Sequence, residues 1–352
     1  MFLDSGGLVL EVLPLPGGRA RLVRVYGDSP CVCLPDSLPA PDGSGPLALT
    51  ELGDYCFSES ARGLHPADRL CRYAVDEAGR ASLVSAFAAP APDSPPLHPV
   101  CGSFVEEVIL PHGLQVMGSC AFYNCRKLRQ LSAGAGVLTL GSDVFLNCFA
   151  LETLVVRAEP DQPTGLFALV NNITEHVSAL FWPEDAPAPL AGLWYPAYWE
   201  DIEESPAHIL LHTFSGQGYH YRQCFLNNRV LPVEYDAIFP QGHDADDAGI
   251  MAMLCFYRLR WPWQLSEAAR ADYRAFLARN TGRVLTRLLK AQDLEAIRAL
   301  LALDVFDAAA FAEGAALAAR ADNAPAAALL ADAEHRLLAA QAPRRKRYDF
   351  DF

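Results

Sequence analysis

The sequence predicts an α+β fold in which a solenoid of short parallel strands is followed by an α-helical, repeat-like domain. A segment that begins near residue 108 matches the segment 23 residues later, which indicates stacked structural repeats. Beyond residue 245 the apolar residues recur at the three- and four-residue spacing of amphipathic helices. With 352 residues, 51% of them hydrophobic and 20% charged, the chain can fill two or three structural units.

The repeat is clearest between residues 105 and 153. Five residues of one copy recur 23 positions later: Gly118, Phe122, Asn124, Cys125 and Leu128 fall on Gly141, Phe145, Asn147, Cys148 and Leu151. A period of about 20 to 29 residues is typical of leucine-rich repeats, in which each coil gives one short strand to a stacked core. We expect strands within 105–110, 128–133 and 151–156, and a fourth within 177–183 after a longer interval of 26 residues.

The recurring residues all suit a structural task. The Gly allows a tight backbone turn, the Phe fills the interior, and the Asn-Cys pair offers small groups to an inner ladder. For Cys125 and Cys148 we therefore favour core packing over reactive thiols. Cys31-Val-Cys33 has no further Cys or His at a ligand-like spacing, and a strand would place both thiols on one face.

Weaker copies of the repeat lie upstream. Residues 32–38 resemble the start of the coil at 108, and residues 52–60 resemble its Gly-x-x-x-Phe centre, so we expect the solenoid to begin near residue 20. On these residues the chain resembles the BspA-type leucine-rich repeat family of bacteria and some protists, over roughly residues 20–185. The resemblance implies coils that each contain a strand, an Ile-Pro-like corner and an Ile-Gly-x-x-Ala-Phe-x-x-Cys segment.

Two features depart from that family pattern. Residues 61–100 interrupt the series with a Pro-rich segment, which we expect to form a loop or an extended excursion. Ser60 stands where the pattern has Cys. Many members of the family are exported surface proteins, but no export signal is visible in this sequence, so that role is not carried over.

Three further segments follow the predicted solenoid of residues 1–185. Residues 186–245 are rich in aromatics and turn residues and are expected to cap or connect the solenoid. Residues 246–342 are expected to be helical, with Asp246, Asp247 and Ser266 as N-terminal caps. Residues 291–303 resemble the second half of an ankyrin-like unit and 323–330 echo it; we favour stacked helical hairpins over true ankyrin repeats. Residues 343–352 form a tail.

Composition limits the classes of partner. The formal net charge of −14 repels phosphate backbones and anionic membrane surfaces, so neither nucleic acid nor a membrane is expected as a partner. No signal peptide and no apolar run of about 18 residues is visible, so we expect a cytoplasmic protein. Its ten cysteines are expected to be free thiols.

The sequence contains no complete motif for catalysis, a cofactor or a metal. His208 and His212 fall in an apolar segment that reads as a strand, where they would lie too far apart to share one ion. Gly216-x-Gly218 lacks the third Gly and the downstream acid of a dinucleotide loop. The remaining case for an enzyme is a pocket within 186–245 that would join His208, His220, Arg222 and Asp236.

We therefore predict a non-catalytic scaffold that binds a protein partner through the exposed strand face of the solenoid. The alternatives are a structural subunit of a larger bacterial or phage-tail-like assembly and a cryptic enzyme. The tail, with a basic run followed by alternating aromatics, is either a docking peptide or a solvated end, and the second is favoured. The candidate partner-binding residues are Glu106, Arg129, Glu152, Trp194, Tyr195, Trp199, Tyr348, Phe350 and Phe352.

Overall fold

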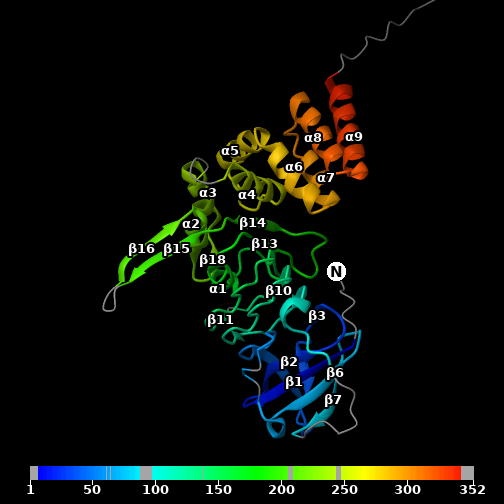
Figure 1. Ribbon diagram of the computed structural model, residues 1–352, viewed down its shortest axis with the longest axis vertical. Helices are drawn as coiled ribbons and strands as arrows, with labels where there is room; N and C mark the ends of the chain where they lie inside the picture. Colours follow the sequence, from blue (N-terminus) through cyan, green and yellow to red (C-terminus); the bar gives the residue numbers. More distant parts are fainter. Residues whose placement is uncertain are drawn as a thin grey trace, which may run out of the picture. The chain divides into compact units, whose positions relative to one another are not determined.

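A computed structural model describes residues 7–60, 62–63, 65–87, 97–136, 138–204, 209–242 and 247–341 (Figure 1). The chain divides into two compact units, Met1–Phe239 and Pro240–Phe352, which are described separately. The division falls within one helix, α3 (Pro232–Gly242), six residues before the boundary predicted at 245/246. The aromatic-rich segment up to Phe239 therefore belongs to the same unit as the repeats.

The repeats build a first ladder of parallel strands. Its members, in spatial order, are β3 (Cys31–Cys33), β8 (Glu107–Ile109), β10 (Gln130–Ala133), β12 (Thr153–Val156) and β13 (Val177–Phe181). The strand segments expected from the 23-residue repeat are confirmed, and so is the upstream copy at β3. One row of paired residues, with a member from each strand, is buried throughout: Val32, Val108, Leu131, Leu154 and Ala179. The antiparallel strand β14 (Ala191–Tyr195) pairs with β13 and closes this ladder.

The same coils build a second, shorter ladder. It contains β5 (Pro46–Leu52), β9 (Val116–Met117) and β11 (Thr139–Leu140), all parallel. At its other side β5 joins an N-terminal sheet in the order β5-β2-β1-β6-β7, which Figure 1 shows in blue and cyan. The strands of that sheet are β1 (Leu8–Leu15), β2 (Arg19–Tyr26), β6 (Cys71–Val75) and β7 (Ala81–Ala86), while β4 (Ser37–Pro39) pairs with β5.

The prediction that residues 61–100 form only a loop or an extended excursion is wrong. After the 3-10 helix η1 (Ala67–Arg69), β6 and β7 form a hairpin that extends the N-terminal sheet through antiparallel pairing of β6 with β1. Cys71, Tyr73 and Val75 alternate with less buried residues, so β6 has one buried face. The Pro-rich stretch 88–96 lies outside the described residues, and the repeats resume after η2 (Gly102–Phe104).

Aromatic rings and amide side chains stack from coil to coil. The rings of Phe57 and Phe122 lie 4.8 Å apart and nearly parallel, and those of Phe122 and Phe145 lie 5.5 Å apart. Asn147 Nδ2 donates a hydrogen bond of 2.8 Å to Asn124 Oδ1. The interior roles predicted for the Phe and Asn positions, and the upstream copy around Phe57, are confirmed.

The repeated glycines serve a purpose other than the predicted tight turn. Neither Gly118 nor Gly141 has a positive φ, but a Cβ atom on either would lie 2.5 Å from a backbone nitrogen of the preceding coil, that of Asp54 or Ser119. Close approach of neighbouring coils therefore excludes a side chain there. The turn is made instead at Cys120 and Asp143, which are equivalent positions and have φ near +55°, and at the two asparagines of the ladder.

Beyond β14 the first unit ends in short elements. We number the coils by their first-ladder strands, so that coils one to four begin at β3, β8, β10 and β12. The fourth coil contains α1 (Leu166–Asn171). The segment after β14 contains β15 (Trp199–Glu204), β16 (Ile209–Ser215), α2 (Gly218–Arg222), β17 (Phe225–Leu226) and β18 (Arg229–Val230). Arg222 is fully buried and its guanidinium donates only to backbone carbonyls. The acceptors are Val170, Ile173 and Glu175 in the fourth coil, Pro196 after β14, and Gly218. One side chain thus ties the last coil to its cap.

The second unit contains helices within Pro240–Phe352. They are α4 (Ala248–Arg260), α5 (Glu267–Ala278), α6 (Thr281–Lys290), α7 (Leu294–Leu301), α8 (Ala308–Arg320) and α9 (Ala324–Gln341). Asp247 and Ser266 cap α4 and α5 as predicted, accepting from Gly249 N at 2.7 Å and Ala269 N at 3.2 Å. No described helix is long and apolar enough to cross a membrane.

Two helical hairpins, α6–α7 and α8–α9, have equivalent turns 30 residues apart (Figure 1). Asp293 N bonds to Leu288 O at 3.1 Å in the first turn, and Asn323 N bonds to Ala318 O at 3.0 Å in the second. Each polar residue then caps the next helix through its side chain. The hairpins pack with α6 against α8 and α7 against α9.

Candidate functional site

The predicted partner-binding residues of the strand face form one row. Arg129 N donates to Glu106 O at 2.8 Å, and Glu152 N donates to Arg129 O at 3.0 Å, so the three residues lie on successive coils in register. Arg129 and Glu152 are exposed and Glu106 is half-buried. The row carries alternating negative, positive and negative charge.

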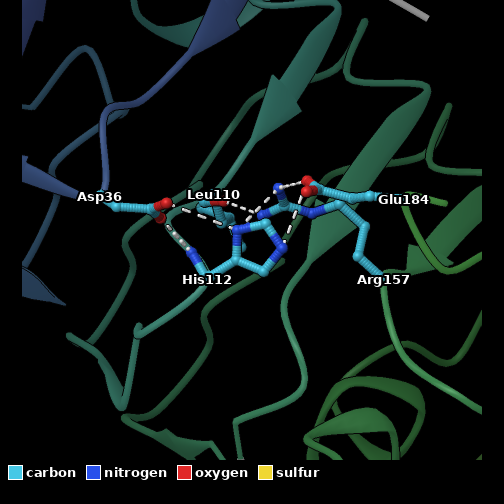
Figure 2. Close-up of polar contacts among 5 residues, drawn as sticks. All are labelled: Asp36, Leu110, His112, Arg157 and Glu184. Carbon is cyan, nitrogen blue, oxygen red and sulfur yellow. Dashed lines mark hydrogen bonds and ion pairs between the residues drawn. The ribbon is translucent and has the colours of Figure 1, made fainter.

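A cluster of charged side chains lies at the corner where the first ladder ends in each coil (Figure 2). His112 lies between two carboxylates, with Nδ1 3.5 Å from Asp36 Oδ2 and Nε2 3.2 Å from Glu184 Oε1. Arg157 Nη1 lies 3.1 Å from the same Glu184 oxygen and 3.3 Å from His112 Nδ1. We call Asp36, His112, Arg157 and Glu184 the corner cluster.

The repeat itself brings these residues together. Asp36, His112 and Glu184 each follow a proline at the end of a strand, in Pro35-Asp36, Pro111-His112 and Pro183-Glu184. The backbone also positions the Asp36 carboxylate, because His112 N donates to Asp36 Oδ1 at 2.6 Å. The corner prolines were noted in the sequence, but the side chains that follow them were not selected as site residues.

Arg157 reaches across a whole coil. It follows β12, yet its Nη2 donates to the backbone oxygen of Leu110, two coils earlier, as Figure 2 shows. The coil between them has Gly134 at this corner, and a Cβ atom there would collide with the backbone of His112. Gly134 is therefore required because neighbouring coils approach closely at this corner.

The corner cluster is suited to recognising a charged group. The side chain of Arg157 is mostly buried, whereas Asp36 and Glu184 are exposed and His112 is partly exposed. A carboxylate of a partner could approach the imidazole and guanidinium, and a cation could approach the two acids. Nearby, burial raises the pKa of the Cys33 thiol, and Arg157 opposes that rise. In the described part of the chain, no group of three His, Cys, Asp or Glu side chains could hold a metal ion.

Two of the predicted aromatic residues are not available to a partner. Trp194 is 2% exposed and Tyr195 is 0% exposed, so naming them as partner-binding residues was wrong. Both lie in β14, where Tyr195 stacks on Phe225 and meets the edge of Tyr235. Trp199, at the start of β15, is 63% exposed and remains a candidate. Tyr348, Phe350 and Phe352 lie outside the described residues.

Among the residues named for an enzyme pocket, the described ones differ in burial and in their contacts. Arg222 is buried and bonded to carbonyls, and burial lowers its pKa to about 10. His220 lies on the exposed side of α2, and His208 lies outside the described residues. A Cβ atom at Gly218 would collide with the backbone oxygens of Pro196 and Ala197. Close packing therefore explains this glycine without a nucleotide-binding loop.

Comparisons with known proteins agree with this geometry. Residues 101–176 match the model of the BspA type leucine rich repeat region (six copies). No curated protein matches the chain. A solved leucine rich cell surface protein from Faecalibacterium prausnitzii is 14% identical, with a TM-score of 0.24; the match covers 42% of this chain and 35% of that one. The repeats between residues 101 and 176 are of the BspA leucine-rich type.

Proposed function

We propose that the chain is a non-catalytic scaffold, a leucine-rich solenoid followed by helical repeats, which binds a protein partner through the outer face of the first ladder. Leucine-rich repeats generally serve protein interaction, which supports the class of function. The observation that supports this choice of surface is the charged row of Glu106, Arg129 and Glu152, which lies in register with the strands and outside the core.

The chemistry of that face favours a polar partner of mixed charge. The outward positions beside the row include the half-exposed residues Glu107, Gln130 and Thr153, and the corner cluster lies at the far end of the same strands. Charges of both signs at fixed spacing select a partner with the complementary pattern more than they add affinity. The partner's surface should therefore present charges of both signs.

Charge reversal tests this surface. Full-length Arg129→Glu/Glu152→Lys should lose the specific partner that the wild-type chain retains during affinity purification from its native organism, followed by mass spectrometry. The matched control is Arg320→Glu/Asp272→Lys, which reverses one exposed charge of each sign on helices of the second unit and should keep the partner. A partner retained equally by both variants would contradict the proposal, and co-sedimentation with large particles would favour a structural subunit instead.

We also propose a reducing, cytoplasmic setting. All ten cysteines are free, and six of them are buried, which supports a protein that keeps its thiols reduced. Protein denatured directly from cells in the presence of an alkylating reagent should carry ten modified cysteines. A reproducible deficit of two or more would contradict this setting.

A further inference from the structure

The second ladder has an open end. In the turn-rich segments that follow β9 and β11, backbone amides at alternate residues of one coil donate to carbonyls of the next: Cys120 N to Ser142 O at 2.9 Å, Phe122 N to Val144 O at 3.0 Å, and Asn124 N to Leu146 O at 3.0 Å. The equivalent amides one coil later belong to Asp143, Phe145 and Asn147. In the described part of the chain these three amides have no hydrogen-bond acceptor.

The fourth coil explains why the ladder stops. It is three residues longer than the two 23-residue coils before it, and α1 stands where those coils have their turn-rich segment. A helix directs its carbonyls along its own axis, so α1 does not offer acceptors at alternate residues to the coil beneath it. Gly165 lets the start of the helix approach Leu138, and α1 contacts β11.

A hollow of about 320 Å³ lies where the next rung would be. Asp143, Phe145 and Asn147 all line it, together with Asn172, Thr174 and Tyr198 on the opposite side. Two apolar side chains at its rim, Leu146 and Phe149, are exposed, the second by 65%. Amides spaced two residues apart beside an apolar rim are the features with which a sheet edge takes up an extended peptide.

Charge narrows the kind of peptide. Asp143, Glu175 and Glu200 line the hollow, and no Lys, Arg or His does. Asp143 and Glu175 are exposed, so their charges face whatever enters. A carboxylate cluster at a peptide site selects a Lys or Arg side chain and repels an acidic one.

We propose that this hollow, the open rung, binds an extended segment of a partner protein that carries Lys or Arg. The segment offers backbone carbonyls at alternate residues to the amides of Asp143, Phe145 and Asn147, as the third coil does for the second. Its basic side chain lies against Asp143 and Glu175, and an apolar side chain covers Leu146 or Phe149. The inference extends the proposed scaffold function to a second surface.

A pair of synthetic peptides tests the proposal on the full-length chain. One peptide copies residues 140–148, the segment of the third coil whose carbonyls accept from the amides of the second coil. The other is the same peptide with Asp143→Lys. We expect the Lys peptide to bind at least tenfold more tightly in a fluorescence polarisation titration. Its binding should slow hydrogen exchange at the amides of Asp143, Phe145 and Asn147 by at least tenfold.

Variants of the chain separate charge recognition from loss of folding. Asp143→Asn/Glu175→Gln should abolish the preference for the Lys peptide, while the exposed control pair Glu159→Gln/Asp185→Asn should preserve it. Absence of binding by both peptides, or binding that leaves the three amides unprotected, would overturn the proposal. The strand-face variant Arg129→Glu/Glu152→Lys should bind the peptide normally, so failure here and failure of the proposed scaffold surface are distinguishable.

Discussion

The two ladders run through the same coils and end differently. The first ladder is closed by β14, whose five residues are all buried and whose strand is antiparallel to its neighbour. The second ladder stops at β11 and leaves three amides facing a hollow. A solenoid has to cover both ends of its core, but only apolar surface demands a cover. Unpaired amides can be satisfied by water, so the second ladder can end without a cap.

Closure of the first ladder depends on Arg222, and its removal should have the largest effect. Arg222→Ala leaves the carbonyls of Val170, Ile173, Glu175, Pro196 and Gly218 without their donor. A buried acceptor left without a donor costs about 1–3 kcal/mol, so the loss of several such bonds together should cost at least about 3 kcal/mol. Urea denaturation followed by tryptophan fluorescence measures the loss. Arg222→Lys keeps the charge but not the planar fork, so its stability should lie between those of the wild type and the alanine variant. A loss below about 1 kcal/mol for Arg222→Ala would show that the cap is stable without this side chain.

The phenylalanine stack should report the open end directly. Phe122 has a ring on each side, whereas Phe145 has a ring on one side only and lines the hollow. Phe122→Ala should cost about 3–5 kcal/mol of unfolding free energy, and Phe145→Ala about 1 kcal/mol less, since one aromatic contact is missing there from the start. Phe122→Leu serves as the milder control. Equal losses at both positions would mean that other contacts of the buried Phe145 ring compensate for the missing aromatic neighbour.

The two ladders also show which parts of the fold and of the candidate sites can be predicted from the sequence. The 23-residue match was sufficient for the strands and their register, because equivalent residues of a repeat must occupy equivalent places. The hairpin of β6 and β7 was missed because its residues do not repeat and border a Pro-rich stretch. The open rung had a signal in the sequence, the interval of 26 residues before β13, but an interval does not tell which part of a coil has changed. The partners of Arg222 are backbone carbonyls, which leave no trace in side-chain pattern.

The corner cluster should contribute less than either core feature. Arg157→Ala removes the donor to Leu110 O and the ion pair with Glu184. An unsatisfied, mostly buried acceptor costs about 1–3 kcal/mol, so the loss should fall in that range. Glu184→Gln is the control, because an exposed ion pair is worth about 0–1 kcal/mol. A larger loss for Glu184→Gln than for Arg157→Ala would mean that the carboxylate holds the corner and that the cross-coil bond does not.

The smallest expected effect concerns Asn147, the last residue of the asparagine ladder. Its φ of +66° suits Asn and Gly better than other residues, and its side chain donates to Asn124 at 2.8 Å. Asn147→Ala loses the hydrogen bond and gains backbone strain, so we expect a loss of about 2 kcal/mol. Asn147→Gly loses the bond alone and should cost about 1 kcal/mol, as measured by the same denaturation. The difference between the two variants isolates the strain. If the two variants lose the same stability, the turn at Asn147 relaxes when the side chain is removed. The amides of the open rung are then less well preorganised to receive a peptide than the amides of the equivalent turn in the second coil.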